Sequence, residues 1–241
     1  MAQPMTSGGL AAVLAHPDDE SFGCAGALAL ARDAGATTRL LVVTRGEAGS
    51  SDGSSDPATG DRREAELICA ARAIGLDEVS LLDGYPDGAV ADESFERLVD
   101  EIAAWLADRR PAAVITFGPH GVTGHPDHIA VGSATRWAVE RLADLGTAPN
   151  AVYVISPIFD PSGNRYDLSA EEQSATHRIT ITAVASRKAD ALACHESQSD
   201  VSEELAALRA AIESGAPIHE GFHRVRPLVA SPHPDFDTTL L

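Results

Sequence analysis

The chain has 241 residues, 44% of them hydrophobic, which is enough for a sizeable core, and we expect a single domain over residues 1–241. Acidic residues number 36 against 18 basic ones, and the formal net charge of -18 argues against nucleic acid and anionic membranes as partners. No stretch approaches the ~18 apolar residues of a membrane helix and no secretory leader is evident, so we expect a cytoplasmic protein without membrane insertion that acts on a small molecule.

The first predicted element is a buried strand over residues 10–15, an uninterrupted apolar run. It ends at the acidic cluster His16-Pro17-Asp18-Asp19-Glu20, and a helix is predicted over about 22–34. His16 therefore emerges at the carboxyl end of a strand, where open α/β sheets place their ligand sites. A His-Pro-Asp sequence also occurs in ordinary turns, in which the Asp caps the following helix.

Strands and helices alternate through the next hundred residues, which predicts a mostly parallel sheet with helices on both faces. A polar loop over 46–60 has the length and composition of a lid or a substrate-contacting segment, with disorder as the alternative. The predicted elements are strand 39–43, helix 61–74, strand 78–82, helix 92–108 behind Asp92, strand 112–117, helix 126–143 and strand 151–155.

The remainder of the chain is predicted to be less regular. Residues 157–173 form a polar excursion, and a short strand over 178–182 and helices over 184–195 and 200–213 follow. The predicted core covers about residues 10–200. The proline-rich extension over about 215–241 is expected to wrap the surface or to reach a neighbouring subunit, so a homo-oligomer is one expectation. The turn Ser231-Pro232-His233-Pro234-Asp235 is interpreted as part of this tail.

A second cluster, His125-Pro126-Asp127-His128, follows the strand over 112–117 and a glycine-rich loop over 118–124. Two strand ends can therefore deliver side chains to one crevice. A catalytic zinc takes three protein ligands, usually His and carboxylate, and leaves a fourth position for water. His16, Asp19 and His128 would supply these ligands, and Asp18 would remain free to act as a general base.

A dinucleotide-binding enzyme is the alternative that the fold class suggests, and the sequence disfavours it. No Gly-x-Gly-x-x-Gly follows the first strand. The position that would cradle a phosphate holds Asp18, Asp19 and Glu20, which would repel a pyrophosphate.

Both clusters resemble the PIG-L/LmbE family of zinc-dependent N-deacetylases, through Ala15-His16-Pro17-Asp18-Asp19-Glu20 and Gly124-His125-Pro126-Asp127-His128. Members of this family remove an acetyl group from N-acetylglucosamine units of glycolipids, thiol-sugar precursors and related conjugates. The resemblance runs from about residue 10 to about residue 200, and it implies a Rossmann-like fold. It includes Arg63-Glu64-Ala65-Glu66, Tyr85-Pro86-Asp87-Gly88 and His195-Glu196-Ser197-Gln198.

The resemblance implies roles for the residues of the two clusters. His16, Asp19 and His128 would bind the metal, which is zinc or another divalent ion, and Asp18 would be the base. His125, in its charged form, would stabilise the oxyanion of the tetrahedral intermediate. Asp127 would orient a neighbouring histidine and raise its pKa, with simple packing as the alternative.

The resemblance also implies that Arg63 and Asp87 approach the sugar hydroxyls. Arg63 could instead pair with Glu64 or Glu66 on a helix surface. Thr123 stands where many relatives carry a tyrosine, so the step that this tyrosine assists would pass to His120 or to water. The role of His195 is left between helix packing, capping and catalysis.

Two alternatives to an N-acetylglucosamine deacetylase remain at the same metal centre: hydrolysis of a different amide, and a metal-binding protein without catalysis. The second is disfavoured because a purely structural metal site would need neither Asp18 nor His125.

Two features of the composition bear on the environment of the protein. The three cysteines, Cys24, Cys69 and Cys194, are odd in number and far apart, which predicts reduced thiols rather than a disulfide framework. The acidic excess, with Lys188 as the only lysine, fits either adaptation to high salt or the composition of a GC-rich genome.

Overall fold

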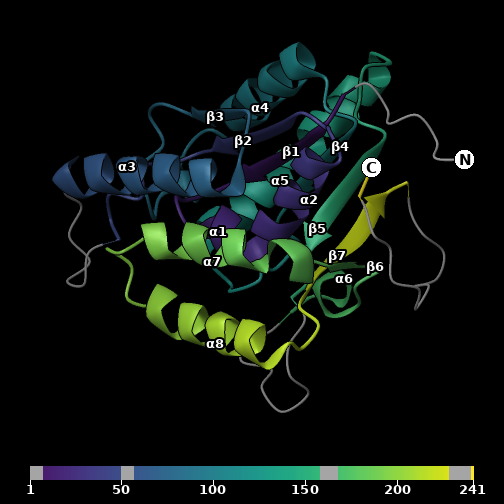
Figure 1. Ribbon diagram of the computed structural model, residues 1–241. Coiled ribbons are helices and arrows are strands. Elements are labelled where there is room, and N and C mark those ends of the chain that lie inside the picture. The colour runs from purple at the N-terminus through teal and green to yellow at the C-terminus, as the bar shows by residue number, and fades with distance from the viewer. Residues whose placement is uncertain (1–7, 50–56, 158–167, 228–239) are drawn as a thin grey trace, which may run out of the picture.

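A computed structural model of the protein describes residues 8–49, 57–157, 168–227 and 240–241. The described residues form a sheet with the strand order β3-β2-β1-β4-β5-β7-β6 (Figure 1). The strands from β1 to β5 pair in parallel, whereas β7 is antiparallel to both of its neighbours. The strands are β1 (Leu10–Leu14), β2 (Thr38–Val42), β3 (Glu78–Leu81), β4 (Ala113–Thr116), β5 (Ala151–Ile155), β6 (His177–Thr180) and β7 (His219–Arg226).

The central strand β1 explains the position of the first motif. All five of its residues are buried, because β2 and β4 flank it and helices cover both faces of the sheet. A parallel strand covered on both faces is a continuous apolar run, which is the pattern of this segment. The chain leaves β1 at Leu14 and reaches His16 two residues later, at the carboxyl edge of the sheet.

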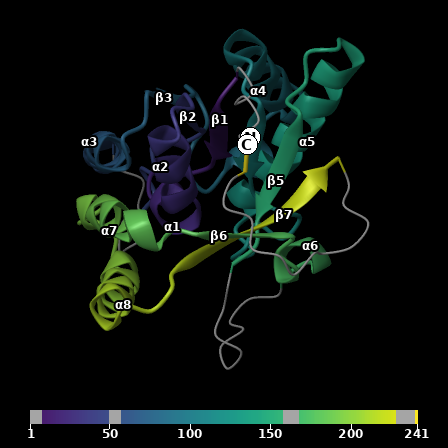
Figure 2. The same ribbon diagram turned by 45° about the vertical axis from the view of Figure 1, so that its right-hand side comes forward.

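Helices cover the two faces of the sheet in separate groups (Figure 2). Helices α4 and α5 pack together on one face, and α2, α3 and α7 cover the other, with α8 outside α7. This confirms the predicted α/β fold. The helices are α1 (Asp19–Gly23), α2 (Ala25–Asp33), α3 (Pro57–Ile74), α4 (Phe95–Arg109), α5 (Pro126–Asp144), α6 (Ala170–Gln173), α7 (Ala185–Cys194) and α8 (Val201–Ser214), with short 3-10 turns at Val90–Asp92 and Thr182–Val184.

Strand β7 is the main departure from the prediction, which assigned this segment to a surface tail. It pairs with β5 on one side and β6 on the other. The segment was missed because it is mostly polar, and of its eight residues only Glu220, Gly221 and Phe222 are buried. The predicted start of a helix at Asp92 was also wrong. Helix α4 begins at Phe95, and its N-cap is Ser94, whose Oγ accepts the backbone N–H of Arg97.

Glu220 of β7 ties the strand to the helical layer. Its carboxylate accepts the backbone N–H groups of Gly26 (2.9 Å) and Ala27 (2.8 Å) at the start of α2. Lys188 of α7 donates to the same carboxylate (2.7 Å) and to the carbonyl of Phe22 (2.7 Å), and both charged groups are buried. A buried ion pair of this kind is tolerated because hydrogen bonds satisfy both partners.

The prediction of three reduced thiols is wrong in this structure. Cys69 on α3 and Cys194 at the end of α7 form a disulfide, with their Cα atoms 5.7 Å apart, and Cys24 is buried and free. The two bonded cysteines are separated by 125 residues. Only the packing of α3 against α7 brings them together, and sequence spacing carries no information about that contact.

Three predicted segments fall partly or wholly outside the described residues: 50–56 of the first loop, 158–167 of the polar excursion, and the turn over 231–235. Within the ranges that the structure does describe, no helix combines the length and apolar character needed to cross a membrane.

Candidate active site

The turn after β1 is closed by a side chain from its own motif. Asp19 Oδ2 accepts the backbone N–H groups of His16 (2.7 Å) and Ala15 (3.2 Å). This leaves Asp19 Oδ1 to face the second motif, where it lies 3.2 Å from His128 Nε2. The turn is thereby fixed with one carboxylate oxygen directed across the crevice.

The second motif is the first turn of α5. Pro126 occupies the first helical position, and His125 is the N-cap, with its Nδ1 accepting the backbone N–H of Asp127 (3.2 Å). Proline is favoured at this position because its missing N–H would have no partner there. Helical periodicity then presents His125 and His128 on the same side of the turn.

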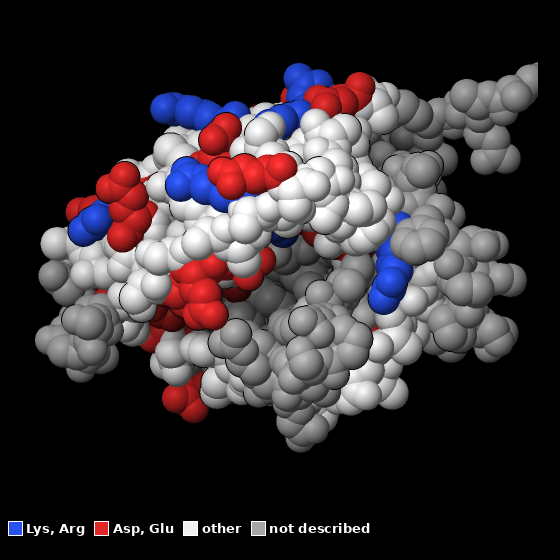
Figure 3. All heavy atoms as spheres, turned by 60° about the horizontal axis from the view of Figure 1, so that its bottom comes forward, with Lys and Arg blue, Asp and Glu red and all other residues white. Residues whose placement is uncertain are grey.

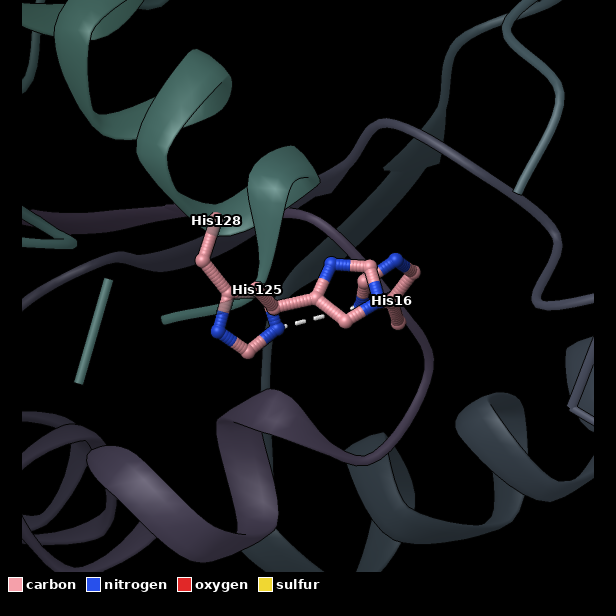
Figure 4. Close-up of side chains that lie close together, drawn as sticks. All are labelled: His16, His125 and His128. Carbon is pink, nitrogen blue, oxygen red and sulfur yellow. Dashed lines mark hydrogen bonds between the residues drawn. The ribbon is translucent and has the colours of Figure 1, made fainter. Parts of the chain in front are cut away.

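Side chains from the two motifs converge, and Figure 4 shows the imidazoles of His16, His125 and His128 directed toward one another. His16 Nδ1 lies 3.1 Å from His128 Nε2 and 3.7 Å from Asp19 Oδ2. Zinc bonds of about 2.0–2.2 Å in a tetrahedron require ligand atoms roughly 3.3 Å apart. These side chains therefore fit a divalent metal with three protein ligands. Atoms of His125 also lie within 4.8 Å of the two histidines.

The remaining ring nitrogens of the two candidate ligands are anchored. His16 Nε2 lies 3.0 Å from Asp87 Oδ1 and 3.1 Å from Asp127 Oδ2, and His128 Nδ1 lies 2.9 Å from the carbonyl of Gly121. Such contacts are typical of metal-binding histidines, because they fix the ring orientation and the tautomer. Burial lowers the pKa of His16, but the hydrogen bonds to Asp127 and Asp87 outweigh it and raise this pKa to about 10.

The histidine that Asp127 orients is His16. Its buried carboxylate contacts His16 and accepts the backbone N–H groups of Gly88 (2.7 Å) and Val90 (3.0 Å). Burial, followed by the charges of His16 and His128, lowers the pKa of His125 below its ordinary value. Because His125 Nδ1 accepts a hydrogen bond, the neutral ring carries its proton on Nε2.

Asp18 lies between the candidate ligands His16 and Asp19 in the sequence, and its backbone is strained. Its φ of 115° is in the region that favours glycine, and such strain is concentrated at functional sites. Burial, followed by the charge of Asp19, raises the pKa of Asp18 to about 7, while Arg63 and His195 oppose the shift. A carboxylate with a pKa near neutrality is suited to accept and return a proton.

Arg63 points into the site rather than along the surface of α3. Its Nη2 donates to Asp18 Oδ2 (2.8 Å) and to the carbonyl of Pro17 (2.6 Å), and its Nη1 donates to the carbonyl of Gly46 (3.1 Å). The alternative pairing with neighbouring glutamates is therefore wrong. Asp87 lies 3.8 Å from Arg63 Nη1, so the two predicted substrate-binding residues are adjacent.

The glycine-rich loop before α5 is held by a residue that the sequence reasoning missed. Glu172 of α6 is buried and accepts the backbone N–H groups of Val122 (2.8 Å) and His120 (3.3 Å). It also forms a capping box with Ser169, a Ser-x-x-Glu signature that was visible in the sequence. Thr123 of this loop lies with its Oγ1 3.4 Å from His128 Nδ1.

The acidic composition is visible on one face of the molecule. Figure 3 shows a hollow on this face, with Asp and Glu side chains gathered beside it. A surface of this charge attracts cations, divalent metal ions included, and repels anionic ligands.

Comparison with known proteins identifies the family. Residues 11–139, more than half of the chain, match the family described as PIG-L: GlcNAc-PI de-N-acetylase. The protein belongs to the PIG-L family. This PIG-L protein is 32% identical over 195 residues to a probable N-acetyl-alpha-D-glucosaminyl L-malate deacetylase 2 of Bacillus subtilis, and the match covers 78% of this chain and 82% of that protein.

A second relative matches over a shorter part of this PIG-L protein. It is the 1D-myo-inositol 2-acetamido-2-deoxy-alpha-D-glucopyranoside deacetylase of Mycobacteroides abscessus, 34% identical over 159 residues. The match covers 57% of each chain, so this protein aligns with little more than half of that enzyme.

Solved structures with the same fold carry more than one activity. The conserved protein TT1542 of Thermus thermophilus aligns over 97% of this chain and 100% of its own, with a TM-score of 0.69 and 26% identity. The N,N'-diacetylchitobiose deacetylase of Pyrococcus horikoshii aligns over 89% of this chain and 82% of its own, with a TM-score of 0.67 and 22% identity. The 4-carboxy-2-hydroxymuconate hydratase GalB of Pseudomonas putida aligns over 92% of this chain and 98% of its own, with a TM-score of 0.69 and 20% identity. The reaction must therefore be argued from the site.

Proposed function

We propose that this protein is a metal-dependent N-deacetylase that hydrolyses the acetamide of an N-acetylglucosamine-type conjugate to a free amine and acetate. The observation that carries the proposal is the convergence of His16, Asp19 and His128 beside Asp18 and His125. The named activities of the relatives, which deacetylate N-acetylglucosamine conjugates, support the class of substrate.

The proposed metal ligands are His16, Asp19 and His128, and zinc is the first candidate. When bound there, a divalent metal would supply a Lewis acid that polarises the acetyl carbonyl and lowers the pKa of water. The short distances between these three side chains and the anchored second nitrogens of both histidines support this ligand set. The contacts of His16 Nε2 with Asp87 and Asp127 keep Nδ1 as the nitrogen that faces the metal.

Asp18 is the proposed general base. Arg63 holds Asp18 Oδ2, so Oδ1 remains to take a proton from the attacking water. After the tetrahedral intermediate forms, Asp18 returns this proton to the leaving nitrogen, and the C–N bond breaks to give the amine and acetate. A pKa near 7 suits both transfers, because neither protonation state is strongly favoured.

His125 is the proposed donor to the acetyl oxygen. The neutral ring carries its proton on Nε2, since Nδ1 accepts the N–H of Asp127. A donor fixed before the reaction stabilises the negative charge that develops on this oxygen without reorganisation. The charged imidazole first expected is not required for this role.

Arg63 and Asp87 remain our candidates for contact with the sugar hydroxyls, because they match family positions. Both side chains are also engaged with the catalytic groups, Arg63 with Asp18 and Asp87 with His16. Loss of either one would therefore disturb the catalytic groups as well as any sugar contact.

The test is release of primary amine and acetate from a panel of N-acetylglucosaminides by the zinc-loaded protein, the Asp18→Asn variant and an Asp190→Asn control. Asp190 is exposed on α7 and belongs to neither motif. We expect Asp18→Asn to retain zinc and to lose about 10²- to 10⁴-fold in kcat, and the control to match the unmodified protein.

Equal activity in Asp18→Asn would refute the assignment of the base. No release from any member of the panel, with zinc bound, would refute the substrate class and direct the search to other amides.

A further inference from the structure

A buried pair behind the site takes no part in the mechanism above. Glu20 and His195 are both fully buried, and His195 Nε2 lies 2.8 Å from Glu20 Oε1. The two residues are 175 positions apart in the chain. His195 Nδ1 is buried without a hydrogen-bond partner among the described residues, so the bond to Glu20 is the contact that fixes this ring.

Glu20 links His195 to the backbone of Asp18. The second oxygen, Glu20 Oε2, accepts the backbone N–H of Asp18 at 3.1 Å, and Ser21 Oγ donates to Oε1 at 2.6 Å. A buried carboxylate without donors is costly, so these contacts determine the orientation of Glu20. Removing the donor from His195 would leave Glu20 with the donors of Ser21 and Asp18 alone, so its carboxylate would be held less firmly against Asp18.

The N–H of Asp18 is the group that needs such a partner. Asp18 has a φ of 115°, and a strained backbone conformation of this kind persists only if the surrounding structure holds it. The carbonyl of Asp18 is held separately, because it accepts the N–H groups of Ser21 (2.8 Å) and Phe22 (3.1 Å) in α1. Glu20 therefore fixes the backbone N–H of Asp18, while α1 fixes its carbonyl.

The helices behind the site determine the position of His195 itself. The turn after α7 is tied to α3 by Ser197, whose Oγ and N–H both donate to Glu66 at 2.6 and 3.0 Å. The disulfide at Cys194 joins the same two helices one residue before His195. Helix α3 also carries Arg63, which holds the side chain of Asp18.

We propose that His195 is a positioning residue that acts through Glu20 to hold the backbone of Asp18, and with it the carboxylate, in the reactive geometry. This inference rests on the proposed role of Asp18 as the base. His195 touches neither the metal ligands nor the open side of the site, and its function is to keep a strained residue in place.

The test compares His195→Leu, which keeps the volume without the donor, with His195→Gln, whose amide can donate to Glu20. We expect His195→Leu to lower kcat by about 10- to 100-fold, the effect of a misplaced catalytic group, with KM and zinc content unchanged. His195→Gln should recover most of the activity. Asp190→Asn, at an exposed position of the same helix α7, should match the unmodified protein.

Three outcomes would overturn the inference: unmodified kcat in His195→Leu, no recovery in His195→Gln, or an equal loss in Asp190→Asn. Crystal structures of the unmodified protein and His195→Leu supply a readout that does not depend on activity, because φ of Asp18 should leave its positive value in the variant. An unchanged φ would reject the inference even if the proposed deacetylase activity were absent, and a changed φ would support it.

Discussion

The two motifs that face each other across the crevice are held in different ways. In the second motif, local rules suffice: His125 caps α5, Pro126 occupies its first position, and His128 follows one turn later. In the first motif, Asp18 has φ of 115°, and residues from α3 and from the end of α7 hold it in place. Local geometry is therefore sufficient to place the proposed ligand His128, whereas the proposed base Asp18 depends on the packing of distant helices.

The largest expected effect tests whether the two motifs form one centre. His16→Ala and His128→Ala remove one proposed ligand from each motif, and each should reduce zinc content from stoichiometric to near zero. Activity should fall about 10³-fold or more, since a metal contributes several kcal/mol to stabilising the transition state. Metal analysis of the purified variants decides the matter, and full zinc occupancy in either one would mean that the motifs do not share a metal.

The disulfide tests the dependence of the first motif on α3 and α7. Reduction removes a link between residues 125 positions apart, and the free energy of unfolding should fall by about 2–4 kcal/mol. Urea unfolding with and without dithiothreitol measures this change. The Cys69→Ser, Cys194→Ser double variant is the control, because its stability should not respond to the reductant. Equal stability of the oxidised and reduced protein would show that packing alone joins the two helices.

Asp127 connects the two motifs, and its loss should have a smaller effect. Asp127→Asn weakens the anchor of His16 Nε2, and zinc affinity should fall by about 10- to 100-fold, or about 1.4–2.7 kcal/mol. Asp144→Asn, at the other end of α5, is the matched control. Competition with a chelating dye measures both affinities, and an unchanged affinity in Asp127→Asn would indicate that Asp87 alone anchors the ring.

The smallest effect concerns the strain itself. Glycine adopts positive φ without a steric penalty, so Asp18→Gly should be more stable than Asp18→Ala by about 1 kcal/mol. At the helical position Asp190 the order should reverse, because alanine favours a helix over glycine by about 1 kcal/mol. Thermal unfolding of the four variants gives both differences. A more stable alanine at position 18 would mean that the backbone there is not strained.

Much of the sheet could be predicted because its central strands are buried on both faces. The apolar run over 10–15 and the run over 112–117 marked two neighbouring parallel strands, and the motif that follows each was expected to meet the other. Strand β7 could not be found in this way, since its polar residues give no such pattern and its partners lie far away in sequence.

The site residues also fall into those that the sequence could predict and those that it could not. The convergence of His16, Asp19 and His128 was expected because each motif follows a predicted buried strand, a feature that is visible in the sequence. The inward direction of Arg63 and the contact of His195 with Glu20 depend on how α3 and α7 pack. No spacing rule relates residues that are 175 positions apart.

Burial of the only lysine has a practical consequence for chemistry carried out on this protein. Lys188 is enclosed by Glu220 and the carbonyl of Phe22, so its ammonium is shielded from reagents that acylate amines. Assays that count newly formed primary amines with a fluorogenic dye should therefore have a low background from the folded enzyme. Lysine-directed labelling or immobilisation, for the same reason, should fail until the chain unfolds.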